Sequence, residues 1–237
     1  MVDGPERGRL ATRPPPAGRH RVEKAVEKAA PGSRELALGS SARAWLRVPS
    51  ASPDPGAQPL LVALHGAGGR ADGMLTMVAD AADRHGVLVL APQSTLSSWD
   101  MIRGGFGPDV RLVDQALSQV LDEHDVDPDR IAVCGFSDGA SYAASLGIAN
   151  GDLFGHVMAW SPGFASAEVA HGRARFYISH GTRDRVLPVE RCNRRLVPRL
   201  RSFGYDVVYE EFDGPHTAPP EVVDRSVRWF LESRLED

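Results

Sequence analysis

Residues 135–139 read Gly135-Phe136-Ser137-Asp138-Gly139. The pentapeptide follows an apolar run at 130–133, which predicts a buried strand, and it opens a segment at 138–149 that predicts a helix. A G-x-S-x-G pattern between a strand and a helix is typical of the nucleophile elbow, a turn so tight that its serine is held in a strained backbone conformation. Glycine two positions before and after the serine avoids collisions with neighbouring elements. The pattern therefore predicts Ser137 as a nucleophile at the carboxyl end of a strand.

Short apolar runs alternate with helical patterns on both sides of this motif. The expected strands are at 35–38, 43–48, 59–64, 87–90, 130–133, 156–160, 175–179 and 206–212. The expected helices are at 72–84, 109–124, 138–149, 190–203 and 221–232, and Asp109 is expected to cap the second of them. Such alternation implies parallel strands that are covered on both faces. The predicted fold class is α/β, with a mostly parallel central sheet, helices on both faces and no large cap domain.

A serine hydroxyl is a weak nucleophile at neutral pH and needs a base. The elbow orders its partners along the chain as serine, then an acid, then histidine. Asp184 and His216 follow the last two predicted strands, so they should meet Ser137 at one edge of the sheet. We predict that His216 is the general base and that Asp184 orients its imidazole. Asp213 is the alternative acid, but its place at a strand end suits a turn, and His180 is expected to be structural.

A glycine-rich segment, His65-Gly66-Ala67-Gly68-Gly69, directly follows the strand predicted at 59–64. It would let the backbone approach a substrate and supply one N–H of an oxyanion hole, which we assign to Ala67. The second N–H is expected from Asp138, and Gly66 and Gly68 are expected to contact the substrate. His65 is a candidate either for substrate contact or for a surface or packing role. The segment fits neither G-x-G-x-x-G nor the P-loop pattern, so a phosphate-binding loop is not favoured.

Together these motifs resemble the α/β-hydrolase superfamily over nearly all of residues 34–237. The segments at 65–69, 135–139, 180–188 and 214–216 are similar to those of the phospholipase/carboxylesterase branch and of small polyhydroxybutyrate-depolymerase-type esterases. The resemblance implies hydrolysis of acyl esters or thioesters without a metal or an organic cofactor. Asp138 departs from the pattern, because relatives more often carry a neutral residue after the serine. Its carboxylate would repel an anionic substrate unless it turns away or is paired.

The pocket is expected to be formed by loops. The segment at 93–108 is long for a plain connection, and Trp99 within it is a candidate either for substrate contact or for a packing anchor. Phe164 is expected on the opposite wall, and Val186 next to the catalytic acid. No apolar lid is visible in the sequence, which favours an open cleft for small, short-chain or water-soluble esters.

Several other functions remain open on the same fold. A thioesterase, a lysophospholipase and a peptidase would use the same residues, and a catalytically inactive relative could act as a binding protein. The complete set of serine, aspartate, histidine and glycine-rich loop argues against the inactive protein. A dehalogenase would need a carboxylate at position 137, and a dienelactone hydrolase is expected to have cysteine there, but the residue is serine.

The 237-residue chain contains 42% hydrophobic and 24% charged residues, values close to those of soluble globular domains. A net charge of −4 gives no indication of binding to nucleic acid or to an anionic membrane. No segment predicts a membrane span or a signal peptide, and we expect a cytoplasmic protein, monomeric or homodimeric, whose partner is a small-molecule ester.

The first 30 residues differ in composition from the rest. They are rich in arginine, proline, glycine and alanine, which predicts a disordered tail with a short helix at 22–29, before a catalytic domain at 31–237. Cys134 and Cys192 are too few to form a disulfide framework in a chain of this length, and we expect both to be buried free thiols.

Overall fold

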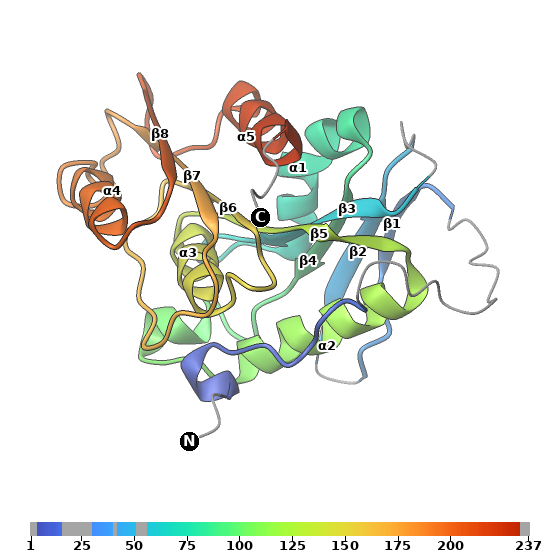
Figure 1. Ribbon diagram of the computed structural model, residues 1–237. Coiled ribbons are helices and arrows are strands. Elements are labelled where there is room, and N and C mark those ends of the chain that lie inside the picture. The colour runs from blue at the N-terminus through green and yellow to red at the C-terminus, as the bar shows by residue number, and fades with distance from the viewer. Residues whose placement is uncertain (1–3, 16–29, 40–41, 51–55, 233–237) are drawn as a thin grey trace.

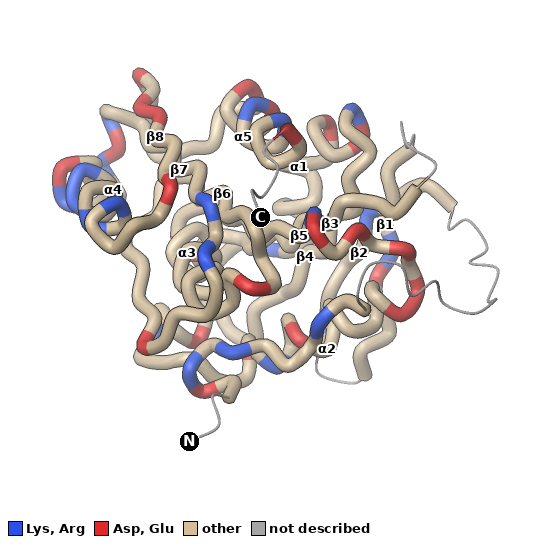
Figure 2. Tube along the Cα trace, in the orientation of Figure 1, with Lys and Arg blue, Asp and Glu red and all other residues tan. Residues whose placement is uncertain are grey.

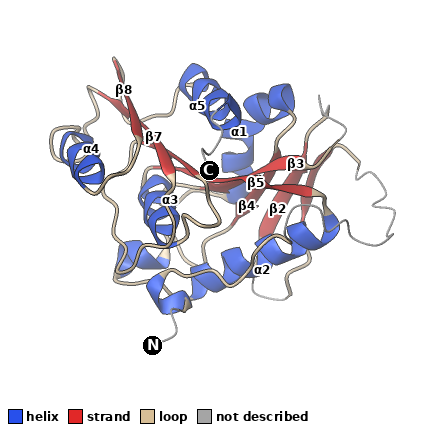
Figure 3. Ribbon diagram, viewed as in Figure 1, coloured by secondary structure: helices blue, strands red, loops and turns tan. Residues whose placement is uncertain are grey.

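The computed structural model describes residues 4–15, 30–39, 42–50 and 56–232. Its centre is an eight-stranded sheet in the order β1-β2-β4-β3-β5-β6-β7-β8, with helices on both faces (Figures 1 and 3). The pairs β1–β2 and β2–β4 are antiparallel and all other neighbours are parallel. The predicted fold class is therefore confirmed.

Most bounds lie within three residues of those expected, but the first strand begins three residues before 35–38 and the fifth extends well beyond 130–133 at both ends. The strands are β1 (Gly32–Glu35), β2 (Ala44–Val48), β3 (Gln58–Leu64), β4 (Leu88–Pro92), β5 (Val126–Phe136), β6 (His156–Trp160), β7 (Arg175–Gly181) and β8 (Val207–Phe212). The helices are η1 (Pro5–Arg7), α1 (Ala71–His85), η2 (Asp100–Arg103), α2 (Pro108–Glu123), α3 (Asp138–Ala149), α4 (Asn193–Ser202) and α5 (Pro220–Glu232). The short helices η1 and η2 were not predicted.

The helices divide the apolar core into two layers. One layer lies between the sheet and α2, α3 and α4, and the other between the sheet and α1 and α5. The central strands face both layers, which is why β4 and β6 are buried at every position and consist almost entirely of apolar residues. Cys134 and Cys192 are both buried and free, as expected. Among the described residues, no helix combines the length and apolar character needed to cross a bilayer.

The N-terminal segment differs from the disordered tail that its composition predicted. Residues 4–15 run along α2 and reach the end of α3 (Figure 1), and Leu10 is only 1% exposed. The Arg9 guanidinium donates to both oxygens of Asp152 at 2.6 Å, and the Leu10 N–H donates to the Asn150 side chain at 2.9 Å. These contacts offset the entropy of ordering the segment. The helix expected at 22–29 lies outside the described residues.

The start of α2 also differs from prediction. Gly107, not Asp109, occupies the N-cap position, and Pro108 is the first residue of the helix. The buried Asp109 carboxylate instead accepts hydrogen bonds from the backbone N–H groups of Thr95 and Asp100, both at 2.8 Å. The Asp109 N–H in turn donates to the Asp100 carboxylate at 2.8 Å. Asp109 therefore ties two positions of the loop at 93–107, Thr95 and Asp100, to the first turn of α2.

Candidate active site

The turn between β5 and α3 has the geometry of a nucleophile elbow. Ser137 adopts φ 57° and ψ −119°, a region that L-residues rarely occupy. A Cβ added to Gly135 would lie 2.2 Å from the Gly139 carbonyl oxygen, and one added to Gly139 would lie 2.1 Å from the Leu64 carbonyl oxygen. Both positions therefore require glycine, for the reason the sequence indicated.

The structure brings the three predicted catalytic side chains together. The Ser137 hydroxyl lies 2.8 Å from His216 Nε2, and His216 Nδ1 lies 2.5 Å from Asp184 Oδ2. They follow β5, β8 and β7 respectively, so the carboxyl edge of the sheet collects them from three separate parts of the chain. The Phe136 ring, with its centroid 4.8 Å from that of His216, packs beside the imidazole.

Asp184 is held as a buried carboxylate. Its side chain is fully buried, and its Oδ1 accepts hydrogen bonds from the backbone N–H groups of Val186 and Leu187, both at 2.8 Å. Burial alone would raise its pKa, but the Leu187 N–H and His216 stabilise the charge and bring the pKa below the usual value. Asp213 instead forms an exposed ion pair with Arg183 at 2.7 Å. This geometry favours Asp184 over the alternative acid.

A second histidine contacts the same carboxylate. His180 Nε2 lies 2.7 Å from the Leu187 carbonyl oxygen and 3.1 Å from Asp184 Oδ2. On its other side, His180 Nδ1 lies 2.7 Å from the Asn193 amide nitrogen, which can only donate, so the ring proton belongs on Nε2. Burial lowers the pKa of His180 and keeps its imidazole ring neutral. His180 is therefore structural, as expected, but the part played by Asn193 was not predicted.

The glycine-rich loop lies directly beside the nucleophile. A Cβ on Gly66 would lie 3.3 Å from the Ser137 Cβ, so only glycine allows this approach without a shift. The N–H groups of Gly68 and Gly69 are occupied, by the carbonyl oxygens of Ser97 at 2.6 Å and Gly66 at 3.0 Å. The Ala67 and Asp138 N–H groups have no partner among the described residues. These are the two donors that the sequence assigned to an oxyanion hole.

His65 fixes the glycine-rich loop and is not placed to contact a substrate. It is 2% exposed, its Nδ1 lies 2.8 Å from the Gly66 carbonyl oxygen, and its Nε2 accepts from the Ser94 N–H at 3.1 Å. Burial lowers its pKa and keeps the ring neutral. Of its two expected roles, His65 therefore has the packing one, because its ring forms hydrogen bonds that join its loop to the segment after β4.

Trp99 serves as the packing anchor, one of its two expected roles. Its side chain is fully buried, its Nε1 donates to the His65 carbonyl oxygen at 2.8 Å, and its ring stacks on Tyr142 with centroids 4.9 Å apart. Because no surface of the Trp99 ring is exposed, the ring does not contact a substrate. Sequence alone could not decide this point, since burial of Trp99 depends on α3.

The Asp138 carboxylate is paired rather than turned freely toward a substrate. Its Oδ2 accepts a hydrogen bond from the Ser98 hydroxyl at 2.6 Å. Ser98 belongs to the loop at 93–107, so one contact fixes that loop to the first residue of α3. A hydroxyl is uncharged, so Ser98 orients the Asp138 carboxylate without neutralising it. The backbone N–H of Asp138, next to Ser137, has no partner among the described residues and can donate to a substrate. Ser98 carried no signal in the sequence by which this role could have been recognised.

The two remaining pocket candidates lie in different places. Phe164 is 41% exposed and lines a groove of about 740 Å³ with Ile148, Leu200, Phe203 and Tyr205, which does not include any residue of the triad. Val186 is 67% exposed and lines a cleft of about 480 Å³ together with His216. Of these two, only Val186 shares a cleft with a triad residue. The described residues contain no cluster of three or more His, Cys, Asp or Glu placed to hold a metal ion.

The arrangement of strands and helices matches solved esterase structures. No family model matches the sequence, and no curated protein matches it by sequence. An S-formylglutathione hydrolase from Staphylococcus aureus is similar with a TM-score of 0.70 at 14% identity, over 86% of this chain and 96% of that one. A carboxylesterase from Bacillus cereus gives 0.64 at 17% identity, over 83% and 96%. A thermostable esterase gives 0.68 at 23% identity, over 86% of this chain and 63% of that chain. At these identities the likeness establishes the fold: the chain has the α/β-hydrolase fold.

Proposed function

We propose that this protein is a serine hydrolase that cleaves carboxylic esters through an acyl-enzyme on Ser137. The observation that carries the proposal is the continuous chain of contacts from Asp184 through His216 to the Ser137 hydroxyl. The same orientation of acid, base and nucleophile recurs in unrelated serine hydrolases because the chemistry requires it. Structural similarity to carboxylesterases agrees with the assignment.

Each step of the reaction has a group in position. His216 Nε2 accepts the Ser137 proton as the oxygen attacks the ester carbonyl carbon, and Asp184 stabilises the imidazolium that forms. The N–H groups of Ala67 and Asp138 would stabilise the oxyanion; losing one such donor typically costs roughly 10²–10³-fold in rate. Collapse of the intermediate breaks the bond to the alcohol, which takes the proton from His216. Water then repeats the sequence on the acyl-enzyme and releases the acid.

The substrates we propose are short-chain or water-soluble acyl esters. The cleft beside His216 is open to solvent along exposed residues such as Val186, and no cap domain covers it among the described residues. Thioesters, lysophospholipids and peptides are alternative substrates of the same machinery, and relative rates on a panel of one short-chain ester, one thioester, one lysophospholipid and one peptide separate them. We further propose a cytoplasmic protein, monomeric or homodimeric, with one catalytic domain over residues 31–237.

Labelling with a fluorophosphonate tests the proposal directly. We expect one covalent adduct, located on Ser137 by peptide mass spectrometry and absent in Ser137→Ala. Ser118→Ala, which removes an exposed serine on α2, should leave labelling unchanged. An unlabelled wild-type protein would support the alternative of a catalytically inactive binding protein.

A further inference from the structure

A cleft on the His216 side of the site has two arginines in its lining. It has a volume of about 480 Å³ and is lined by Arg183, Arg185, Val186, Pro215 and His216. In the proposed reaction, which this inference takes as its basis, the alcohol leaves with the proton that His216 delivers. The alcohol half of the ester must therefore lie against His216. The cleft that His216 lines is the place for that half.

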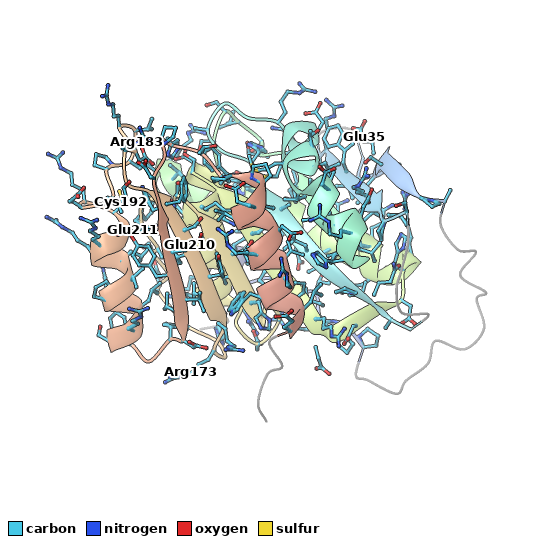
Figure 4. The ribbon with its side chains drawn as sticks, turned by 90° about the horizontal axis from the view of Figure 1, so that it is seen from above. Glu35, Arg173, Arg183, Cys192, Glu210 and Glu211 are labelled. Atoms are coloured by element: carbon cyan, nitrogen blue, oxygen red, sulfur yellow. The ribbon has the colours of Figure 1, made fainter. Side chains whose placement is uncertain are left out.

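The backbone that carries both arginines is fixed. Asp184, which lies between them, accepts from the N–H groups of Val186 and Leu187, and the Arg183 N–H donates to the Gly214 carbonyl oxygen at 2.9 Å. Figure 4 shows Arg183 beyond the carboxyl ends of β7 and β8, at the opposite end of these strands from Arg173. The arginines thus extend from a loop whose shape is set by the catalytic acid itself.

The two arginines differ in how they are paired. Arg183 forms an exposed ion pair with Asp213 at 2.7 Å, whereas Arg185 is exposed and has no ion-pair partner among the described residues. A guanidinium offers several N–H donors in a planar fork that suits carboxylates and phosphates. The only carboxylate within the nucleophile elbow, that of Asp138, belongs to the other part of the site, next to an oxyanion donor. A negatively charged group of the substrate is therefore favoured in the alcohol half, beside Arg185, and disfavoured in the acyl half, beside Asp138.

We propose that Arg185, with Arg183 beside it, binds an anionic group on the alcohol half of the ester. The enzyme would thereby select esters whose alcohol carries a negatively charged group. The shared chemistry is a carboxylate or a phosphate within reach of a guanidinium. Neither arginine takes part in bond making or breaking. The role is one of substrate selection, expressed in kcat/KM and not in the identity of the acyl-enzyme.

The test compares two acetates whose leaving groups have nearly the same shape, 4-acetoxybenzoate and its neutral analogue 4-acetoxybenzamide. At low ionic strength we expect kcat/KM of the wild type to favour the carboxylate about three- to tenfold. The preference should shrink at 0.5 M NaCl, since exposed charges are screened. 4-Acetoxyphenyl phosphate serves as a second arm, which tells whether phosphate is preferred to carboxylate.

Variants of the protein identify the residue responsible. Arg185→Gln should reduce the ratio of the two kcat/KM values to about one, and Arg185→Glu should reverse it. Arg191→Gln makes the same change of charge at an exposed arginine that does not line the cleft, and it should leave the ratio as in the wild type. Equal rates on both acetates, or a preference that survives Arg185→Gln, would overturn the inference while the hydrolase proposal stands. Turnover of neither acetate would defeat both.

Discussion

His180 Nε2 lies 3.1 Å from the same Asp184 oxygen that faces His216. Two imidazoles thus share one buried carboxylate, and only one of them can reach the nucleophile. Asn193, fully buried in α4, donates to the other nitrogen of His180 and keeps the ring proton on the side of Asp184. The acid is therefore oriented from both sides, and its position depends on a residue outside the triad.

Replacing Asn193 should weaken catalysis without removing any triad residue. Asn193→Leu, similar in size, leaves His180 Nδ1 without its donor, and we expect kcat for p-nitrophenyl acetate to fall about tenfold, roughly 1.4 kcal/mol, with little change in KM. Steady-state kinetics at several pH values, with thermal unfolding as a check on the fold, would measure this. Unchanged kcat in a folded variant would limit His180 and Asn193 to a packing role.

The glycine at position 139 should be irreplaceable for steric reasons. In Gly139→Ala the new Cβ would lie 2.1 Å from the Leu64 carbonyl oxygen and 2.5 Å from that of His65, both backbone atoms that cannot rotate away. We expect a loss of about 3 kcal/mol or more in the free energy of unfolding, measured in urea. Gly73→Ala in α1, where the added Cβ meets nothing within 4 Å, should instead stabilise by about 0.5–1 kcal/mol. Equal effects of the two variants would contradict the close approach at the elbow.

The charge of Asp138 should select against anionic acyl groups. The Ser98 hydroxyl orients this carboxylate but does not neutralise it. We expect p-nitrophenyl hemisuccinate to be hydrolysed more slowly than the neutral p-nitrophenyl butyrate. Asp138→Asn retains the backbone N–H and a side-chain oxygen that can accept from Ser98. It should reduce the ratio of kcat/KM for the butyrate to kcat/KM for the hemisuccinate about five- to tenfold. Relative kcat/KM values of the two esters decide the matter, and a ratio that Asp138→Asn leaves unaltered would show that the charge has no influence.

Docking of the N-terminal segment should depend on pH through Asp152. Burial alone would raise the pKa of Asp152, but the guanidinium groups of Arg9 and Arg13 lower it from 3.8 to about 2. A carboxylate whose pKa is lowered on folding stabilises above its unfolded value and loses that contribution as the pH falls through its folded value. Protection of the Leu10 amide from hydrogen exchange should therefore hold down to about pH 4 and decline towards pH 2. In Asp152→Asn the protection of the Leu10 amide should be weaker and nearly independent of pH. If protection fell with pH in the same way in both proteins, Asp152 would not be the source of the pH dependence.

Local patterns predicted those features that neighbouring residues determine. The glycine spacing around Ser137 indicated the elbow because the collisions involve the turn itself, and α3 and β6 have the bounds expected from their apolar runs. The order of acid and base after Ser137 placed Asp184 and His216 at one sheet edge because parallel strands share their carboxyl ends.

Features that depend on distant segments were missed. The glycine-rich loop suggested a substrate contact for His65, but the hydrogen-bond partner that buries its ring comes from the segment after β4. Asp109 has the residue type of a helix cap, yet its carboxylate is engaged by the loop at 93–107. Composition could not show that Leu10 finds an apolar site beside α2 and α3, since that site exists only once the helices have packed.

The measurement that tests the account most directly is the turnover of p-nitrophenyl acetate by Ser137→Ala, with circular dichroism and thermal unfolding to confirm that the fold is retained. A folded variant whose kcat/KM has fallen by at least about 10⁴-fold is the predicted result, because nothing else in the site can form the acyl-enzyme. Hydrolysis at the wild-type rate by that folded variant would contradict the central claim that Ser137 is the nucleophile.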